Sequence, residues 1–125
     1  MRQASLPMYD LPEARAATDR LWAAIRDRLR DAGVEGVPDA LTRADDLQAV
    51  WADPGLLMSQ TCGWPLVHGL RGRLVPMVTP AFGFPGMEGA LYRSFVVVRR
   101  DASFDTLEAL RGTVCALNSW DSQSG

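Results

Sequence analysis

The sequence has no long apolar run and no lysine, and it holds only one histidine and two cysteines. No segment reaches the roughly 18 consecutive apolar residues of a membrane span, so a membrane-spanning chain is not expected. The first ten residues contain no basic stretch followed by an apolar one, so no export signal is expected in this chain. Its thirteen basic residues, all arginine, are scattered among acidic ones to a formal charge of -2, which gives no reason to expect nucleic acid as a partner.

Scarce histidine and cysteine also limit metal and redox chemistry. His68 has no cysteine or carboxylate at metal-ligand spacing, so neither a metal nor another cofactor is expected. Cys62 and Cys115 could form one disulfide, but both stand in apolar or loop contexts in which a free, buried thiol is the commoner interpretation. No G-x-S-x-G or P-loop pattern occurs, so neither of these two motifs points to an enzyme.

What the sequence does contain is an ordinary soluble composition, with 47% hydrophobic and 22% charged residues in 125. The clearest helix is predicted between Asp10 and Gly33, with Asp10 and Glu13 as a capping box and Gly33 as its end. The apolar stripe that should face the core consists of Ala14, Ala17, Leu21, Ile25, Leu29 and Ala32.

Shorter elements follow along the chain. A second helix is predicted in "RADDLQAVWADPG", with Thr42 and Asp45 placed for capping. "LLMSQ" predicts a buried strand and "WPLVHGL" a helical fragment. Three later strands are expected in "RLVPMVTP", "ALYRSFVVVRR" and "TVCAL", the second of which carries the strongest strand signal.

Strands that alternate with helices favour an α/β fold, with a mostly parallel sheet and flanking helices. Ligands of such sheets bind at the carboxyl ends of the strands. Three loops are expected there: "MYD" after a first strand in the short apolar segment of residues 3–8, "SQTCG" after "LLMSQ", and "NSWDSQSG" at the end of the sequence.

The last of these loops is suited to an anion. If a helix begins after Asp121, its free N–H groups and the hydroxyls of Ser122 and Ser124 form a set of donors, and Gly125 allows close approach. The alternative is that Asp121 and Ser122 only cap a helix. Thr61 has the same two interpretations, as a cap or as part of a site. Tyr9 could line a pocket or pack against Trp22.

The stretches "ASLPMYD", "LLMSQTCGWPL" and "LYRSFVVVRRDASFDTLEALRGTVCALNSWDSQSG" together resemble the phosphate, phosphite and phosphonate substrate-binding proteins of ABC transporters. That family has the type 2 periplasmic binding fold, in which two α/β lobes close on a ligand. The resemblance implies that residues 1–100 are the first lobe. It also implies that residues 101–125 are the hinge and the start of an incomplete second lobe.

By the same resemblance, Ser122, Gln123 and Ser124 match the turn that holds phosphonate oxygens, and Gly125 matches the glycine that opens the helix. Gln60 and Thr61 belong to the first-lobe loop that faces the ligand. With Tyr9, these residues make up the expected site. The partners implied are a small oxyanion and a transporter permease.

Other functions stay open at this point. A ligand-sensing domain, a cytoplasmic binding-protein-like domain or a thiamine-pyrimidine precursor synthase could share the fold. The synthase would need clustered cysteine and histidine, for which only Cys62, Cys115 and His68 exist. The expected location is periplasmic if a signal peptide has been removed, and cytoplasmic if Met1 is the native start.

Overall fold

The computed structural model describes residues 2–85, 87–91, 94–117 and 119–120. Contacts between residues divide the chain into two units, residues 1–74 and residues 75–125. These contact-defined units do not test the predicted boundary between lobes near residue 100, which stays a prediction. The first unit contains, in chain order, β1 (Gln3–Ser5), η1 (Pro12–Ala14), α1 (Arg15–Asp31), α2 (Leu47–Ala52), β2 (Leu56–Ser59) and α3 (Gly63–His68).

β1 and β2 form a two-stranded parallel sheet in the first unit. Ala4 lies opposite Met58 and Ser5 lies opposite Ser59, and the register is irregular between Gln3 and Ala4. Parallel strands need a long connection, which η1, α1 and α2 supply here. A small, mixed helix and strand architecture with a parallel sheet is thereby confirmed, and the expected α/β class is compatible with it.

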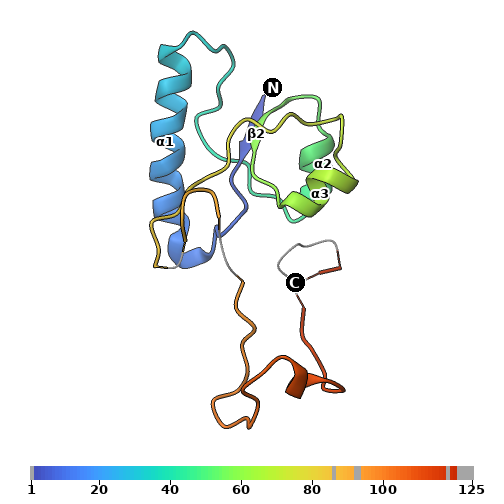
Figure 1. Ribbon diagram of the computed structural model, residues 1–125. Helices are drawn as coiled ribbons and strands as arrows, with labels where there is room; N and C mark the ends of the chain where they lie inside the picture. Colours follow the sequence, from blue (N-terminus) through green and yellow to red (C-terminus); the bar gives the residue numbers. More distant parts are fainter. Residues whose placement is uncertain (1, 86, 92–93, 118, 121–125) are drawn as a thin grey trace. The chain divides into compact units, whose positions relative to one another are not determined.

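Helices lie on both sides of these strands, with α1 on one side and α2 and α3 on the other (Figure 1). Successive side chains of a strand point to opposite faces, so Ala4 and Ser5 serve different helices. Trp22 of α1 packs on the Ala4 face. Trp51 of α2 donates its indole N–H to the Ser59 hydroxyl at 3.1 Å on the other face. One tryptophan therefore anchors a helix on each side of the sheet.

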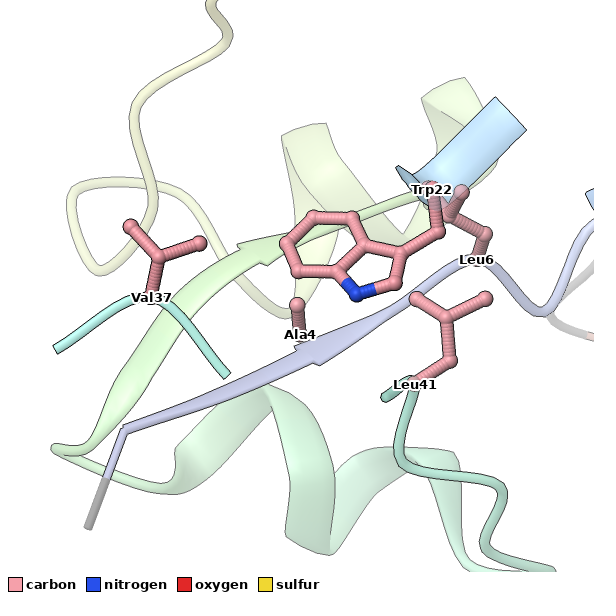
Figure 2. Packing of buried hydrophobic residues seen from close by; sticks show 5 residues of the cluster. All are labelled: Ala4, Leu6, Trp22, Val37 and Leu41. Carbon is pink, nitrogen blue, oxygen red and sulfur yellow. The ribbon is translucent and has the colours of Figure 1, made fainter. Parts of the chain in front are cut away.

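The main core lies between α1 and β1, where Trp22 packs with Ala4, Leu6, Val37 and Leu41 (Figure 2). Trp22 is only 2% exposed, and its Nε1 has no hydrogen-bond partner among the residues that the structure describes. The helix therefore turns a different stripe to the core from the predicted one. Ile25 and Leu29 pack there as expected, whereas Leu21 is half exposed and its neighbour Trp22 replaces it. The rest of the predicted stripe lies at the surface or is half-buried: Ala14, Ala17 and Ala32.

The end of α1 is as predicted, and its cause is visible. Gly33 has a φ of +79°, the left-handed conformation that favours glycine at this position. Its N–H donates to the Arg30 carbonyl at 2.9 Å, and the Val34 N–H donates to the Leu29 carbonyl at 2.9 Å. These two bonds form a Schellman motif, which turns Val34 back toward the core.

α2 (Leu47–Ala52) lies within the predicted stretch "RADDLQAVWADPG" but begins at Leu47, after both predicted caps. Its N-terminal cap is Asp46, whose carboxylate accepts the Ala49 N–H at 3.0 Å. The expected caps Thr42 and Asp45 are therefore wrong. From the N-cap position the Asp46 carboxylate satisfies one of the free N–H groups of the first turn.

The second unit contains, within its described residues, one regular element, the 3₁₀ turn η2 (Glu108–Leu110). The strands predicted in 73–80, 90–100 and 113–117 are wrong for the residues that the structure describes in those segments. Val97, in the strongest predicted strand, is 86% exposed. A β-prone segment becomes a strand only when a neighbouring strand pairs with its backbone, and none does so in the described part of this unit. Across the described residues, no helix is both long enough and apolar enough to cross a bilayer.

Candidate functional site

The carboxyl ends of β1 and β2 bring two of the three predicted loops together. Because the strands are parallel and Ser5 lies opposite Ser59, both chains leave the sheet at the same edge. The Gln60 N–H continues the ladder by donating to the Ser5 carbonyl at 3.3 Å. The Gln60 side chain then accepts the Met8 N–H through Oε1 at 3.2 Å. The loop after β2 is thereby tied to the loop after β1, next to Tyr9.

Gln60 is held on three sides. Besides these two bonds, its carbonyl oxygen accepts the Trp51 indole N–H at 3.3 Å. The bond from the Met8 N–H also fixes the orientation of the side-chain amide, because only the oxygen can accept from an N–H donor. The Nε2 amino group, with two N–H donors, is then the remaining polar group of that side chain. An amide fixed in this way is suited to donate to a negatively charged oxygen.

Tyr9 has an unusual backbone for its residue type. Its φ is +66°, in the left-handed region that bulky residues rarely adopt. Its side chain is 71% exposed, so packing against the buried Trp22 is not favoured, and a position in the wall of a site is the better of the two interpretations. Backbone strain of this kind typically costs about 1 to 3 kcal/mol and tends to occur at functional sites. The sequence carries no signal for it.

Thr61 does not cap a helix. Its hydroxyl donates to the Cys62 carbonyl at 3.2 Å, and the residue at the N-cap of α3 is Cys62, without a side-chain cap bond. The capping interpretation of Thr61 is therefore wrong. Cys62 adds a second link between the two loops, because its Sγ lies 3.7 Å from the Met8 Sδ.

The remaining predicted site residues, Ser122, Gln123, Ser124 and Gly125, lie outside the described residues. The anion cradle that they were expected to form stays a prediction. Of the predicted site, the structure thus assembles Tyr9, Gln60 and Thr61 on neighbouring loops.

An ion network beside this edge was not predicted. Arg43 donates to Asp10 through Nε at 2.6 Å and to Asp19 of α1 through Nη2 at 2.8 Å. Asp10 therefore pairs with Arg43, and the predicted capping box of Asp10 and Glu13 is wrong, since neither η1 nor α1 has a side-chain cap bond. Pairing with a guanidinium offsets the cost of a largely buried carboxylate better than an exposed cap does.

The electrostatics of the network follow from its geometry. The hydrogen bond from Arg43 lowers the pKa of Asp10, although burial opposes that shift. The two carboxylates Asp10 and Asp19 raise the pKa of Arg43. Asp10 and Arg43 are therefore both charged at neutral pH. Two carboxylates around one guanidinium leave an excess of one negative charge.

Metal and thiol chemistry find little support in the described part of the chain. No group of three or more His, Cys, Asp and Glu side chains in that part could hold a metal ion. His68 stacks instead on Trp64, with ring centroids 3.7 Å apart. Cys62 and Cys115 are both free, and Cys115 is exposed, contrary to its expected burial.

Comparison with known proteins gives no match for this chain among family models, curated proteins or solved structures. The resemblance to ABC-transporter binding proteins therefore has no support beyond the stretches of sequence that suggested it. Any function must be argued from the geometry of the described residues.

Proposed function

We propose that this protein is a substrate-binding protein that captures a small oxyanion, phosphate-like or phosphonate-like, for uptake by an ABC-type transporter. The observation that carries the proposal is the bond from the Met8 N–H to Gln60 Oε1, which joins the loops after two parallel strands. Such loops are where α/β sheets bind ligands. The role is one of binding and not of catalysis.

The chemistry of the joined loops is that of a donor site. Gln60 offers its amino group, and the neighbour of Met8 in the chain, Tyr9, is an exposed aromatic residue. The serines Ser122 and Ser124, with the N–H groups before Gly125, would add the donors of a second loop. A hydrogen bond to a charged group contributes about 1.5 to 3 kcal/mol, so three or four would hold a small anion tightly.

The fold proposed for this role is the type 2 periplasmic binding fold, with residues 1–100 in the first lobe and residues 101–125 at the start of the second. The parallel β1–β2 pair with helices on both sides supports an α/β lobe of that kind. Hinge closure of the two lobes would bury the anion and present the loaded protein to a permease.

Isothermal titration of the natural full-length product tests the proposal. The panel consists of phosphate, phosphite, methylphosphonate, aminoethylphosphonate and sulfate. We expect micromolar or tighter binding of at least one member. A folded protein that binds none of them would overturn the proposal.

Variants of the two loops make the test specific. Gln60→Glu keeps an oxygen for the Met8 N–H but replaces the amino donor by a negative charge, so the affinity should fall by at least about 100-fold. Gln48→Glu adds the same charge at an exposed position of α2 and is the matched control. Replacing Ser122 and Ser124 with alanine should abolish binding with the fold intact. Unchanged affinity in both site variants would remove these loops from the site.

A further inference from the structure

A hollow that is open to solvent lies at the end of β1. It has a volume of about 330 Å³ and is lined by the end of β1, the loop after it, Arg15 and the segment 41–47. Small-molecule sites occupy about 300 to 1,000 Å³, so this cavity suits a ligand of few atoms. Tyr9, Gln60 and Thr61 are not among the described residues that line it.

Hydrogen bonds of β1 explain why the two sites are separate. Alternate residues of a strand direct their backbone groups to opposite edges. Gln3 and Ser5 bond toward β2, through the Gly55 carbonyl and the Gln60 N–H. The Ala4 carbonyl points to the opposite edge, where it accepts the Thr42 N–H at 2.7 Å. The segment 41–47 therefore covers the edge of β1 that β2 leaves open.

Arg43 gives the cavity a fixed wall. It belongs to the lining, and its bonds to Asp10 and Asp19 connect the segment 41–47 to the loop after β1 and to α1. The Asp10 side chain is only 10% exposed. A guanidinium held by two carboxylates keeps its position, so this part of the wall is fixed before a ligand arrives.

Two further charged groups of opposite sign line the same cavity, Arg15 and Asp45. Neither takes part in an ion pair within the described residues. Asp10 and Arg43 already pair with each other, and Arg43 pairs with Asp19 as well. The lining charges that remain for a ligand are therefore one positive, on Arg15, and one negative, on Asp45. They fit a ligand that carries both charges.

We propose that this cavity binds a small zwitterionic amino acid. Arg15 receives the carboxylate and Asp45 receives the ammonium group. Leu6, Leu41 and Leu47 line the remaining surface and suit a short methylene chain. The site is independent of the oxyanion site proposed above, because the two share no lining residue among those described.

Titration of the 125-residue chain with charged and half-charged analogues tests the proposal. The probes are β-alanine, 4-aminobutyrate, butyrate and butylamine. Binding of each probe is measured from the amide chemical shifts of residues 41–47. One of the two amino acids should bind at least about tenfold more tightly than both butyrate and butylamine, because each lacks one charge-assisted contact. If butyrate or butylamine bound as tightly as the amino acids, the proposal would be overturned. It would also be overturned if no probe bound at about 10 mM, a concentration at which even a weak site is occupied.

Two variants assign the ends of the ligand. Arg15→Gln should weaken amino-acid binding by about tenfold or more and abolish any binding of butyrate, while butylamine is unaffected. Asp45→Asn should abolish any binding of butylamine and leave the binding of butyrate unaffected. Arg20→Gln and Asp31→Asn change the same charges at exposed positions of α1 outside the cavity and should leave every affinity unchanged.

Equal effects of the site and control variants would overturn the assignment of the two ends. Failure of the oxyanion titration proposed above would not affect this result, because none of these probes is an oxyanion of phosphorus or sulfur. Far-UV circular dichroism of each variant shows whether the fold is kept. The affinities of the unaltered chain for the four probes decide the proposal even where a variant fails to fold.

Discussion

The two units of the chain are similarly rich in apolar residues, yet they use them differently. In residues 1–74 lie both strands, all three α-helices and every buried hydrophobic side chain of the described residues. In the described part of residues 75–125, one 3₁₀ turn forms and the large apolar side chains are exposed or half-buried. Apolar content alone therefore does not produce a core.

The difference lies in pairing between distant segments. β1 meets β2 across more than fifty residues, and the connection between them supplies the helices that cover the pair. Residues 94–98 have stronger strand propensity than β1 does, but no strand pairs with them in the described part of their unit. Propensity for strands thus expresses a fit to neighbours, which residues 3–5 have and residues 94–98 lack.

The largest test of this comparison is a pair of tryptophan substitutions. Trp22→Ala should lower the free energy of unfolding by about 3 to 5 kcal/mol, because it leaves a cavity between α1 and β1. Trp120→Ala, at a residue 91% exposed in the second unit, should change it by less than about 0.5 kcal/mol. Urea unfolding followed by circular dichroism measures both.

Trp22→Phe serves where the alanine variant does not fold. It keeps most of the apolar volume and removes the buried Nε1 donor, which has no partner in the described part of the chain, so the expected loss is under about 2 kcal/mol. Similar losses for the Trp22 and Trp120 variants would mean that the second unit has a core after all.

Features of the fold with local causes could be predicted from the sequence. The existence of α1 depends on the periodicity of its apolar residues, and its end depends on the left-handed Gly33. Both signals lie within one short stretch of sequence, so they can be read without knowing the fold. One position of the α1 stripe was predicted one residue out of place, because Leu21 and Trp22 are both apolar and only the packing on Ala4 selects Trp22. The later strands failed because their partners are not encoded locally.

The candidate site divides in the same way. The meeting of the loops at Tyr9 and Gln60 could be predicted, because parallel strands end at one edge. The role of Asp10 could not, because its partner Arg43 is 33 residues away and a carboxylate before a helix usually caps it. The left-handed backbone of Tyr9 also has no sequence signal.

A second test compares ion pairs in the two units. Arg43 holds the pKa of Asp10 below its ordinary value, so this carboxylate stabilises the fold above the unfolded pKa of about 3.9, and the contribution is lost as the pH falls through the lower folded pKa. Asp10→Asn should therefore cost about 1 to 2 kcal/mol at pH 7 and much less at pH 2.

The control for that test is Asp101→Asn, which breaks the exposed pair of Asp101 with Arg99 in the second unit. Arg99 also lowers the pKa of Asp101, but solvent screens an exposed pair, and little change is expected at either pH. Unfolding by urea at the two pH values measures both variants. Equal losses would show that burial of Asp10 adds nothing to its pair.

The smallest expected effect concerns two glycines with open space around a new Cβ. Gly33→Ala should cost about 1 kcal/mol, because φ at this position is +79° and the left-handed region is unfavourable for alanine. Gly83→Ala, in the second unit and outside that region, should change the free energy of unfolding by less than about 0.5 kcal/mol. Because neither Cβ meets another atom within 4 Å, the difference between the two variants isolates the backbone conformation that ends α1. A loss at Gly83 as large as that at Gly33 would mean that the second unit constrains its backbone as tightly as the first.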